Sequence, residues 1–185
     1  MGRGGTVLGI IGVILAAGAI GFTFVVWNGQ NTTNNLTGNI VVGIWDSLDD
    51  NLDFTPYNLQ KNWLFEFGDN NLNNTDYISV SNTNTRITLL KSGWYRIHIS
   101  VLLGGISDSC SYRLSLLKDG AIESHLDFYV TSSTNDSSWY YIDSSAFVYS
   151  NGTNYIEINE YSTTDDFSPS TSNIYNQLTI EYVAT

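Results

Sequence analysis

The densest group of side chains that could bind an ion is an acidic run in the sequence WDSLDDNLDF. The run places Asp46, Asp49, Asp50 and Asp53 close together along the chain. Carboxylate oxygens are the ligands that Ca²⁺ prefers, and the ion takes about six to eight oxygen ligands. The spacing differs from that of an EF-hand loop, whose turn carries a glycine. The run is therefore a candidate calcium site, and the alternative is an acidic loop that faces solvent ahead of the first strand.

Other reactive residue types occur without the context that catalysis needs. Glu157 and Glu160 could form a carboxylate pair for glycoside hydrolysis, but solvent-facing positions at a strand edge are the simpler interpretation. His98 and His125 have no G-x-S-x-G motif beside them, and no phosphate loop or dinucleotide fingerprint is present. Cys110 is the single cysteine, which excludes an intramolecular disulfide and a cysteine zinc site. We expect no enzyme activity and no cofactor other than calcium.

The charge balance excludes one class of partner. Seven Lys and Arg against 18 Asp and Glu give a net charge of −11 and an isoelectric point near 4.2. A nucleic-acid-binding protein needs a basic face for the phosphates, so the chain is not expected to bind nucleic acid. Hydrophobic residues make up 42% of the chain, which is enough to bury a core.

The apolar segment at residues 6–27, TVLGIIGVILAAGAIGFTFVVW, contains no charged residue. A helix of this length spans roughly 33 Å, which matches a hydrocarbon core of about 30 Å. Arg3 precedes the segment and an acidic region follows it. The positive-inside rule then places residues 1–5 in the cytoplasm and the C-terminal part outside the cell. We predict a single-pass membrane protein with a transmembrane helix at 6–27.

Three alternatives remain open for this N-terminal segment. Ala17-Gly18-Ala19 fits the small-x-small pattern of a cleaved signal peptide. The opening MGRGGT fits the N-myristoylation pattern. Arg3-Gly4-Gly5 before an apolar run resembles the leader of archaeal pilin and archaellin precursors, whose helices pack in a filament core after a peptidase cuts near the glycines. With the Asn-rich composition, this leader suggests an archaeal surface protein.

A polar stalk and several glycosylation motifs follow the apolar segment. Residues 28–39, NGQNTTNNLTGN, are uncharged and without apolar periodicity, which predicts a flexible stalk. Five N-x-S/T sequons occur in the chain, at Asn31, Asn35, Asn73, Asn135 and Asn151. In a segment that faces outward they are candidates for N-glycosylation, which would make the protein a glycoprotein.

Residues 40–185 show alternation with a period of two and no amphipathic helix. In GWYRIHISVLL, residues 93–103, the side chains from Tyr95 to Val101 alternate between an apolar face and a face with Arg96 and His98. Asp119-Gly120 between two apolar runs is a strong hairpin signal. Short strands about ten residues apart predict an all-β extracellular domain, a compact jelly-roll β-sandwich, after the one transmembrane helix.

Residues 67–103 resemble the central part of the tumour-necrosis-factor and complement-globular-head superfamily. Gly93-Trp94-Tyr95-Arg96-Ile97 matches its G-x-Y-x-hydrophobic segment, and the Lys118-Asp119-Gly120 hairpin and the closing strand near 175–183 also fit. Asn151-Gly152-Thr153-Asn154 stands where members usually carry Gly-Asp. The resemblance implies a ten-stranded jelly roll that forms homotrimers outside a membrane. Trimer contacts in this family are typically aromatic, so we expect some of four tryptophans to face a partner subunit: Trp45, Trp63, Trp94 and Trp139.

Three hypotheses about function follow. The first is a membrane-anchored, trimeric cell-surface protein that recognises or adheres to an unknown extracellular ligand through its distal loops. The second is a structural subunit of a surface filament or coat that assembles through its N-terminal helix. The third is a secreted enzyme or sugar-binding protein. The N-terminus discriminates among them, because an intact Met1, a cut near Gly5 and a start at Ile20 give different masses.

Overall fold

A computed structural model of the chain describes residues 39–51, 62–68, 70–81, 83–133, 139–163, 167–170 and 172–184. Asn39–Thr185 forms one compact unit. The predicted transmembrane helix and the sequons at Asn31, Asn35 and Asn135 lie outside the described residues. In the part of the chain that is described, there is no helix with the length and apolar character needed to cross a bilayer.

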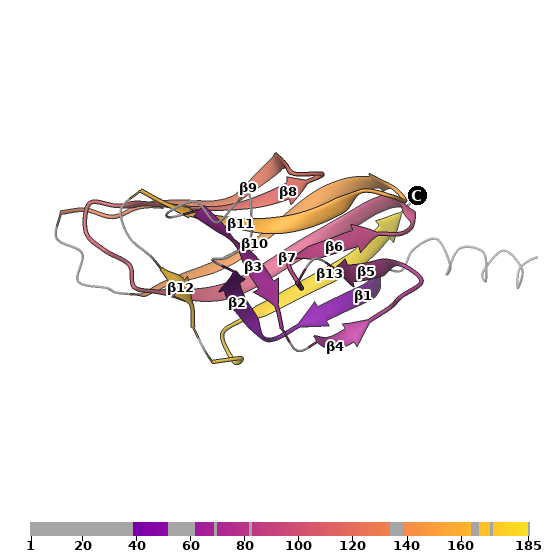
Figure 1. Cartoon of the computed structure of the whole chain (residues 1–185), viewed down its shortest axis with the longest axis horizontal. Helices are drawn as coiled ribbons and strands as arrows, with labels where there is room; N and C mark the ends of the chain where they lie inside the picture. The colour runs from indigo at the N-terminus through magenta and orange to yellow at the C-terminus, as the bar shows by residue number, and fades with distance from the viewer. Residues whose placement is uncertain are drawn as a thin grey trace, which may run out of the picture. The chain divides into compact units, whose positions relative to one another are not determined.

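The first sheet contains the strands that form the candidate site (Figure 1). Its strands pair antiparallel in the order β10, β7, β13, β1 and β4, and the short strand β12 also pairs with β7. Strand β7 is the longest central strand, and it pairs with β10 along one edge and with β13 along the other. The bounds are β10 (Trp139–Asn151), β7 (Ser92–Gly104), β13 (Gln177–Ala184), β1 (Ile40–Trp45), β4 (Asn70–Asn73) and β12 (Ser168–Pro169).

The second sheet is organised around β11 (Tyr155–Ser162). Strand β11 pairs with β8 along one edge and with β3 and β6 along the other. Strand β9 then continues the sheet beyond β8, while β2 pairs with β3 and β5 pairs with β6. The bounds are β2 (Leu48–Asn51), β3 (Asn62–Phe67), β5 (Ile78–Ser81), β6 (Arg86–Leu89), β8 (Ser111–Lys118) and β9 (Ala121–Val130).

The strand order is that of a jelly roll. From β6 onward the chain crosses between the two sheets after β6, β7, β9, β10 and β11, so that strands adjacent in a sheet are distant in sequence. The described residues contain thirteen strands, against the ten that the family resemblance implies. The difference includes the hairpin of β2 and β3 and the two-residue strand β12. The all-β prediction is confirmed for the described residues.

The core lies between the sheets and follows the predicted alternation. Tyr95, Ile97, Ile99 and Val101 of β7 are fully buried, while the residues between them lie on the other face of the sheet. Each such side chain contributes about 1.5–3 kcal/mol by its removal from water. Apolar residues of β1, β3, β5, β6, β8, β11 and β13 complete the core: Val42, Trp45, Trp63, Phe65, Phe67, Ile78, Ile87, Leu89, Leu114, Leu116, Ile156, Ile158, Leu178 and Ile180.

The predicted hairpin between β8 and β9 is confirmed. Asp119 and Gly120 have φ values of 51° and 80°, and a two-residue turn with both φ values positive matches the twist of the strands. The Asp119 carboxylate also accepts the backbone N–H of Tyr155 at 3.0 Å. This bond ties the turn to the start of β11.

One expectation about burial is wrong. Glu157 and Glu160 were expected to face solvent at a strand edge, but β11 is paired on both edges and both side chains are fully buried. Of the four tryptophans, Trp45 and Trp63 are core residues with 1% exposure, whereas Trp94 and Trp139 are exposed, so contact of some of them with a partner subunit stays a prediction. Residues 157 and 160 are three positions apart on one strand and therefore point to opposite faces, which excludes a catalytic carboxylate pair.

Candidate functional site

The outward side of β7 and β10 carries the largest set of exposed aromatic side chains among the described residues. On both strands every second residue faces the core, so the intervening residues form the outer surface of the sheet. We call this surface the aromatic face. Its aromatic members are 42–56% exposed: Trp94 on β7, and Trp139, Tyr141, Phe147 and Tyr149 on β10.

The register of β7 and β10 groups the aromatic rings at the two ends of the face. Tyr149 lies directly opposite Trp94, and their ring centroids are 5.5 Å apart in an edge-to-face arrangement. At the other end Trp139 pairs with Gly104, and a Cβ atom on Gly104 would come within 2.7 Å of the indole ring. Gly104 therefore leaves the space that the Trp139 ring occupies.

Polar side chains fill the centre of the aromatic face and are paired with one another. The Nε2 atom of His98 lies 2.6 Å from the Oδ1 atom of Asp143. The hydroxyls of Ser100 and Tyr141 are hydrogen-bonded. Arg96 lies 3.6 Å from the Glu181 carboxylate on β13. Each carboxylate at the centre thus has a partner side chain, although the chain as a whole carries a net charge of −11.

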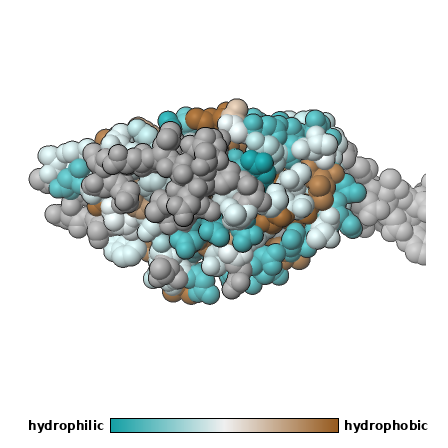
Figure 2. Space-filling view, viewed as in Figure 1, coloured by the Kyte–Doolittle hydropathy of each residue, from teal (hydrophilic) through white to brown (hydrophobic). Residues whose placement is uncertain are grey.

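A second exposed apolar surface lies on β9, which pairs only with β8 in the described residues. Ile122, Phe128 and Val130 are 52–62% exposed, and we call them the β9 stripe. Figure 2 shows a hydrophobic patch at the upper edge of the molecule, where Figure 1 places β8 and β9. Monomeric proteins rarely expose large contiguous apolar patches, which instead mark interaction sites.

The acidic run is distributed differently from its prediction as a loop ahead of the first strand. Strand β1 precedes it, and Asp49 and Asp50 belong to β2. Asp46 and Asp49 line a polar cavity of about 150 Å³, whose other polar residues are Ser47, Ser170, Asn173 and Asn176. Asp53 lies outside the described residues, within which no group of three or more His, Cys, Asp and Glu could hold a metal ion. Calcium binding by the run stays a prediction.

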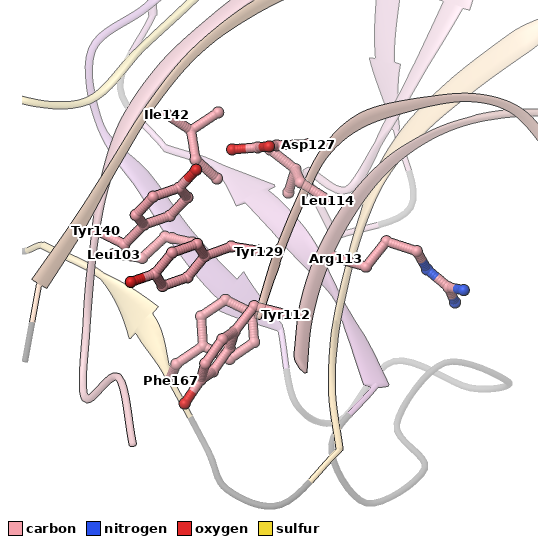
Figure 3. A pocket seen from close by; sticks show the side chains of 9 residues that line it. All are labelled: Leu103, Tyr112, Arg113, Leu114, Asp127, Tyr129, Tyr140, Ile142 and Phe167. Atoms are coloured by element: carbon pink, nitrogen blue, oxygen red, sulfur yellow. The ribbon is translucent and has the colours of Figure 1, made fainter. Parts of the chain in front are cut away.

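A second cavity lies between the sheets, where the rings of Tyr129 and Tyr140 stack at 4.0 Å (Figure 3). Burial and the hydrogen bond that the Tyr140 hydroxyl donates to the Asp127 carboxylate raise the pKa of Tyr140 to about 12. The space beside these rings is about 10 Å³, which holds at most one water molecule. This cavity is too small to be a ligand site.

The remaining candidate residues lie in separate parts of the fold. His98 and His125 belong to different sheets, and the Nδ1 atom of His125 lies 3.0 Å from the Ser115 hydroxyl. Cys110 is buried, with its Sγ atom 3.3 Å from the Ser162 hydroxyl. None of these groups lines either cavity described above.

The sequence did not predict the ion pair between Arg86 on β6 and the buried Glu157 on β11. The Nε and Nη2 atoms of Arg86 both lie 2.9 Å from the Glu157 Oε1 atom, and the guanidinium stacks on Tyr155 at 3.7 Å. Burial raises the pKa of Glu157, while the hydrogen bonds and charge of Arg86 oppose the rise. No sequence signal pairs these residues, because they are 71 positions apart.

Two sequons fall within the described residues. Asn151 is exposed at the end of β10, at the turn to β11. Asn73 lies on β4 opposite Gly43, and its side-chain oxygen is buried without a hydrogen-bond partner among the described residues. From the sequence alone, both sequons are equally good candidates for N-glycosylation.

No protein-family model matches the chain, and no curated protein matches it significantly. Among solved structures, murine APRIL at pH 8.0 is similar over 76% of this chain and 98% of its own, with 11% identity and a TM-score of 0.46. Pika GITRL covers 80% of this chain and 98% of its own, with 12% identity and a TM-score of 0.40. Eiger TNF from S. frugiperda covers 58% and 69%, with 13% identity and a TM-score of 0.40. With TM-scores below 0.5, these similarities do not by themselves define the fold, which follows from the strand order.

Proposed function

We propose that the chain is a membrane-anchored surface protein that forms homotrimers through its jelly-roll domain and recognises or adheres to a partner outside the cell. It has no enzymatic role in this proposal. The observation that carries the proposal is the aromatic face, because five large rings exposed on one flat sheet face are stabilised when a second copy covers them.

Charge supports a second copy as the occupant of this face. Residues 28–185 carry a net charge of 6 − 18 = −12, since Arg3 is the only charge before them, so copies repel each other over most of their surface. On the aromatic face the acidic groups are paired, Asp143 with His98 and Glu181 with Arg96. Two copies can therefore approach there without facing unpaired like charges.

The β9 stripe supports a ring rather than a two-fold dimer. The stripe and the aromatic face belong to different sheets, so they are two distinct apolar surfaces on one chain. Contact between the stripe of one copy and the face of the next would be heterologous, and a heterologous contact that closes makes a cyclic assembly. The trimer is the smallest such ring and is the state that the family resemblance implies.

The same proposal includes a membrane anchor at residues 6–27 and an outward stalk at 28–39. The uncharged apolar run and the single preceding Arg3 support it. The second candidate is a filament or coat subunit, which the Arg3-Gly4-Gly5 leader favours. The mass of the mature N-terminus separates the two. A cut near Gly5 supports the filament, and an intact Met1 supports the anchor.

Light scattering after size exclusion tests the assembly on residues 28–185, which include the whole described core. We expect three times the chain mass for the wild type and a monomer for Phe147→Asp, because the carboxylate would be buried unpaired in the contact. Ile174→Asp is the matched control, since Ile174 is 78% exposed in the loop before β13 and lies on neither apolar surface. A monomeric wild type, or a Phe147→Asp variant with wild-type mass, would refute the assembly.

A further inference from the structure

The two sequons that the structure describes differ in how they present the asparagine, and this difference identifies a modification site. Asn151-Gly152-Thr153 leaves the end of β10 in a turn, with Gly152 at a φ of 97°. Asn73-Asn74-Thr75 likewise begins at the last residue of a strand, β4, which lies at the edge of the first sheet. An enzyme that modifies the asparagine must reach its side-chain amide, and that of Asn151 is exposed, whereas Asn73 is only partly exposed and its Oδ1 atom is buried.

We propose that Asn151 carries an N-linked glycan and that Asn73 does not; the inference rests on the outward location in the proposed function. The Asn151 Oδ1 atom accepts hydrogen bonds from the Thr153 N–H at 2.9 Å and from the Thr153 hydroxyl at 2.8 Å. The side chain of Asn151 is exposed. The sequon is thus folded on itself, and its asparagine is exposed.

This geometry suits the chemistry of glycosyl transfer. An amide nitrogen is a poor nucleophile because its lone pair is delocalised into the carbonyl. Two donors on Oδ1 do not make Nδ2 more nucleophilic, but they make its N–H groups more acidic and so ease the removal of a proton by a base. In the transfer, Nδ2 bonds to C1 of a lipid-linked pyrophosphate sugar, the C1–O bond breaks with its electron pair leaving on the pyrophosphate, and one Nδ2 proton passes to a base of the transferase.

The side chain of Asn73 is less accessible than that of Asn151. Asn73 pairs with Gly43 of β1, and the next residue, Asn74, donates its backbone N–H to the Val42 carbonyl at 2.8 Å. The Asn74 carbonyl in turn accepts the N–H groups of Tyr77 and Ile78 at 2.9 and 3.1 Å. The sequon is therefore fixed against β1 and the following turn, and the buried Oδ1 atom of Asn73 accepts nothing from Thr75.

The glycan and the proposed assembly are compatible. Asn151 follows Tyr149 by two positions on β10, so its side chain leaves the same side of the sheet at the extreme end of the aromatic face. Asp143, at the centre of the face, is eight residues away along the strand, about 26 Å at roughly 3.3 Å per residue. A glycan on Asn151 therefore borders the contact and does not cover its centre.

Peptide mass mapping of the full-length protein, purified from the membranes of its source cells, tests the inference. We expect a sugar mass on the Asn151 peptide, complete loss of that mass in Asn151→Gln and Thr153→Ala, and retention in Thr153→Ser, which keeps the hydroxyl. Asn73→Gln is the matched control and should leave the glycan mass of the whole chain unchanged.

Three negative outcomes are distinguishable. An unmodified Asn151 peptide, in a chain that carries sugar at Asn31 or Asn35, overturns the inference while leaving the outward location in place. A chain without sugar at any sequon overturns the inference and also contradicts the outward location in the proposed function. Sugar on Asn73 with none on Asn151 refutes the structural argument directly.

Discussion

Replacing Arg86 by methionine removes the only cation that hydrogen-bonds to Glu157 among the described residues. The side chain of Glu157 is fully buried, whereas that of Arg86 is 30% exposed. Breaking a buried ion pair by removing one partner costs about 3–5 kcal/mol, because the other charge is left uncompensated. Water reaches the exposed part of the Arg86 site, so we expect the low end, about 3 kcal/mol at pH 7.

The loss of stability in Arg86→Met should depend on pH, in a direction that the pKa shift of Glu157 sets. Burial raises the pKa of Glu157 above its ordinary 4.5, and Arg86 opposes this rise, so removing Arg86 raises the pKa further. A carboxyl with a raised pKa in the folded state contributes its full stability below pH 4.5 and loses it as the pH rises through the folded pKa. The difference between the variant and the wild type should therefore be small near pH 4 and grow toward pH 7.

Urea unfolding of residues 28–185, followed by circular dichroism at one fixed protein concentration, measures the free energy of unfolding of the variant and the wild type at each pH. A loss of about 3 kcal/mol corresponds to a melting temperature roughly 6–12 °C lower. Arg86→Lys is the matched control, since it keeps the charge and should lose less. In the double variant Arg86→Met/Glu157→Gln most of the pH dependence of the loss should disappear. Equal losses for Arg86→Met at pH 4 and pH 7 would refute the role assigned to the buried charge.

Two further predictions concern the packing of the first sheet. Gly43→Val should lower the free energy of unfolding by about 1–3 kcal/mol, because a Cβ atom there would lie 2.5 Å from the Trp45 ring and 2.7 Å from Ile78; a melting temperature equal to the wild type would contradict this clash. Tyr95→Phe should cost about 1–2 kcal/mol in the same unfolding assay, because its hydroxyl bonds both the N–H and the carbonyl of Lys91 at 3.1 Å. Tyr182→Phe, which loses one bond to Ser92, is the control and should cost less.

Local patterns predicted the strands and turns of this domain well. The alternation in residues 93–103 assigned Tyr95, Ile97 and Ile99 to the core and Trp94 to the opposite face, as the structure has them. Asp119-Gly120 predicted its hairpin because both residues tolerate a positive φ. These predictions succeed because strand alternation and turn chemistry depend on neighbours within a few residues.

Predictions that required long-range pairing were wrong or absent. The acidic run was expected to be a loop, but Asp49 and Asp50 lie on a strand that pairs with β3. Glu157 was expected to face solvent because its own neighbours do not reveal that Arg86 lies beside it. The partners of β11 come from three separate parts of the chain, and only folding brings them together.

The sequence by itself determines an acidic chain with one long apolar run, an all-β domain and the residues at its turns. The tertiary structure alone decides which apolar faces are covered. Trp45 and Trp94 are the same residue type on strands of one sheet, yet the first is 1% exposed and the second 46%. Hydropathy is a property of each side chain, whereas burial depends on which face of the sheet the second sheet covers. That choice leaves the aromatic face exposed and makes it the candidate site of assembly.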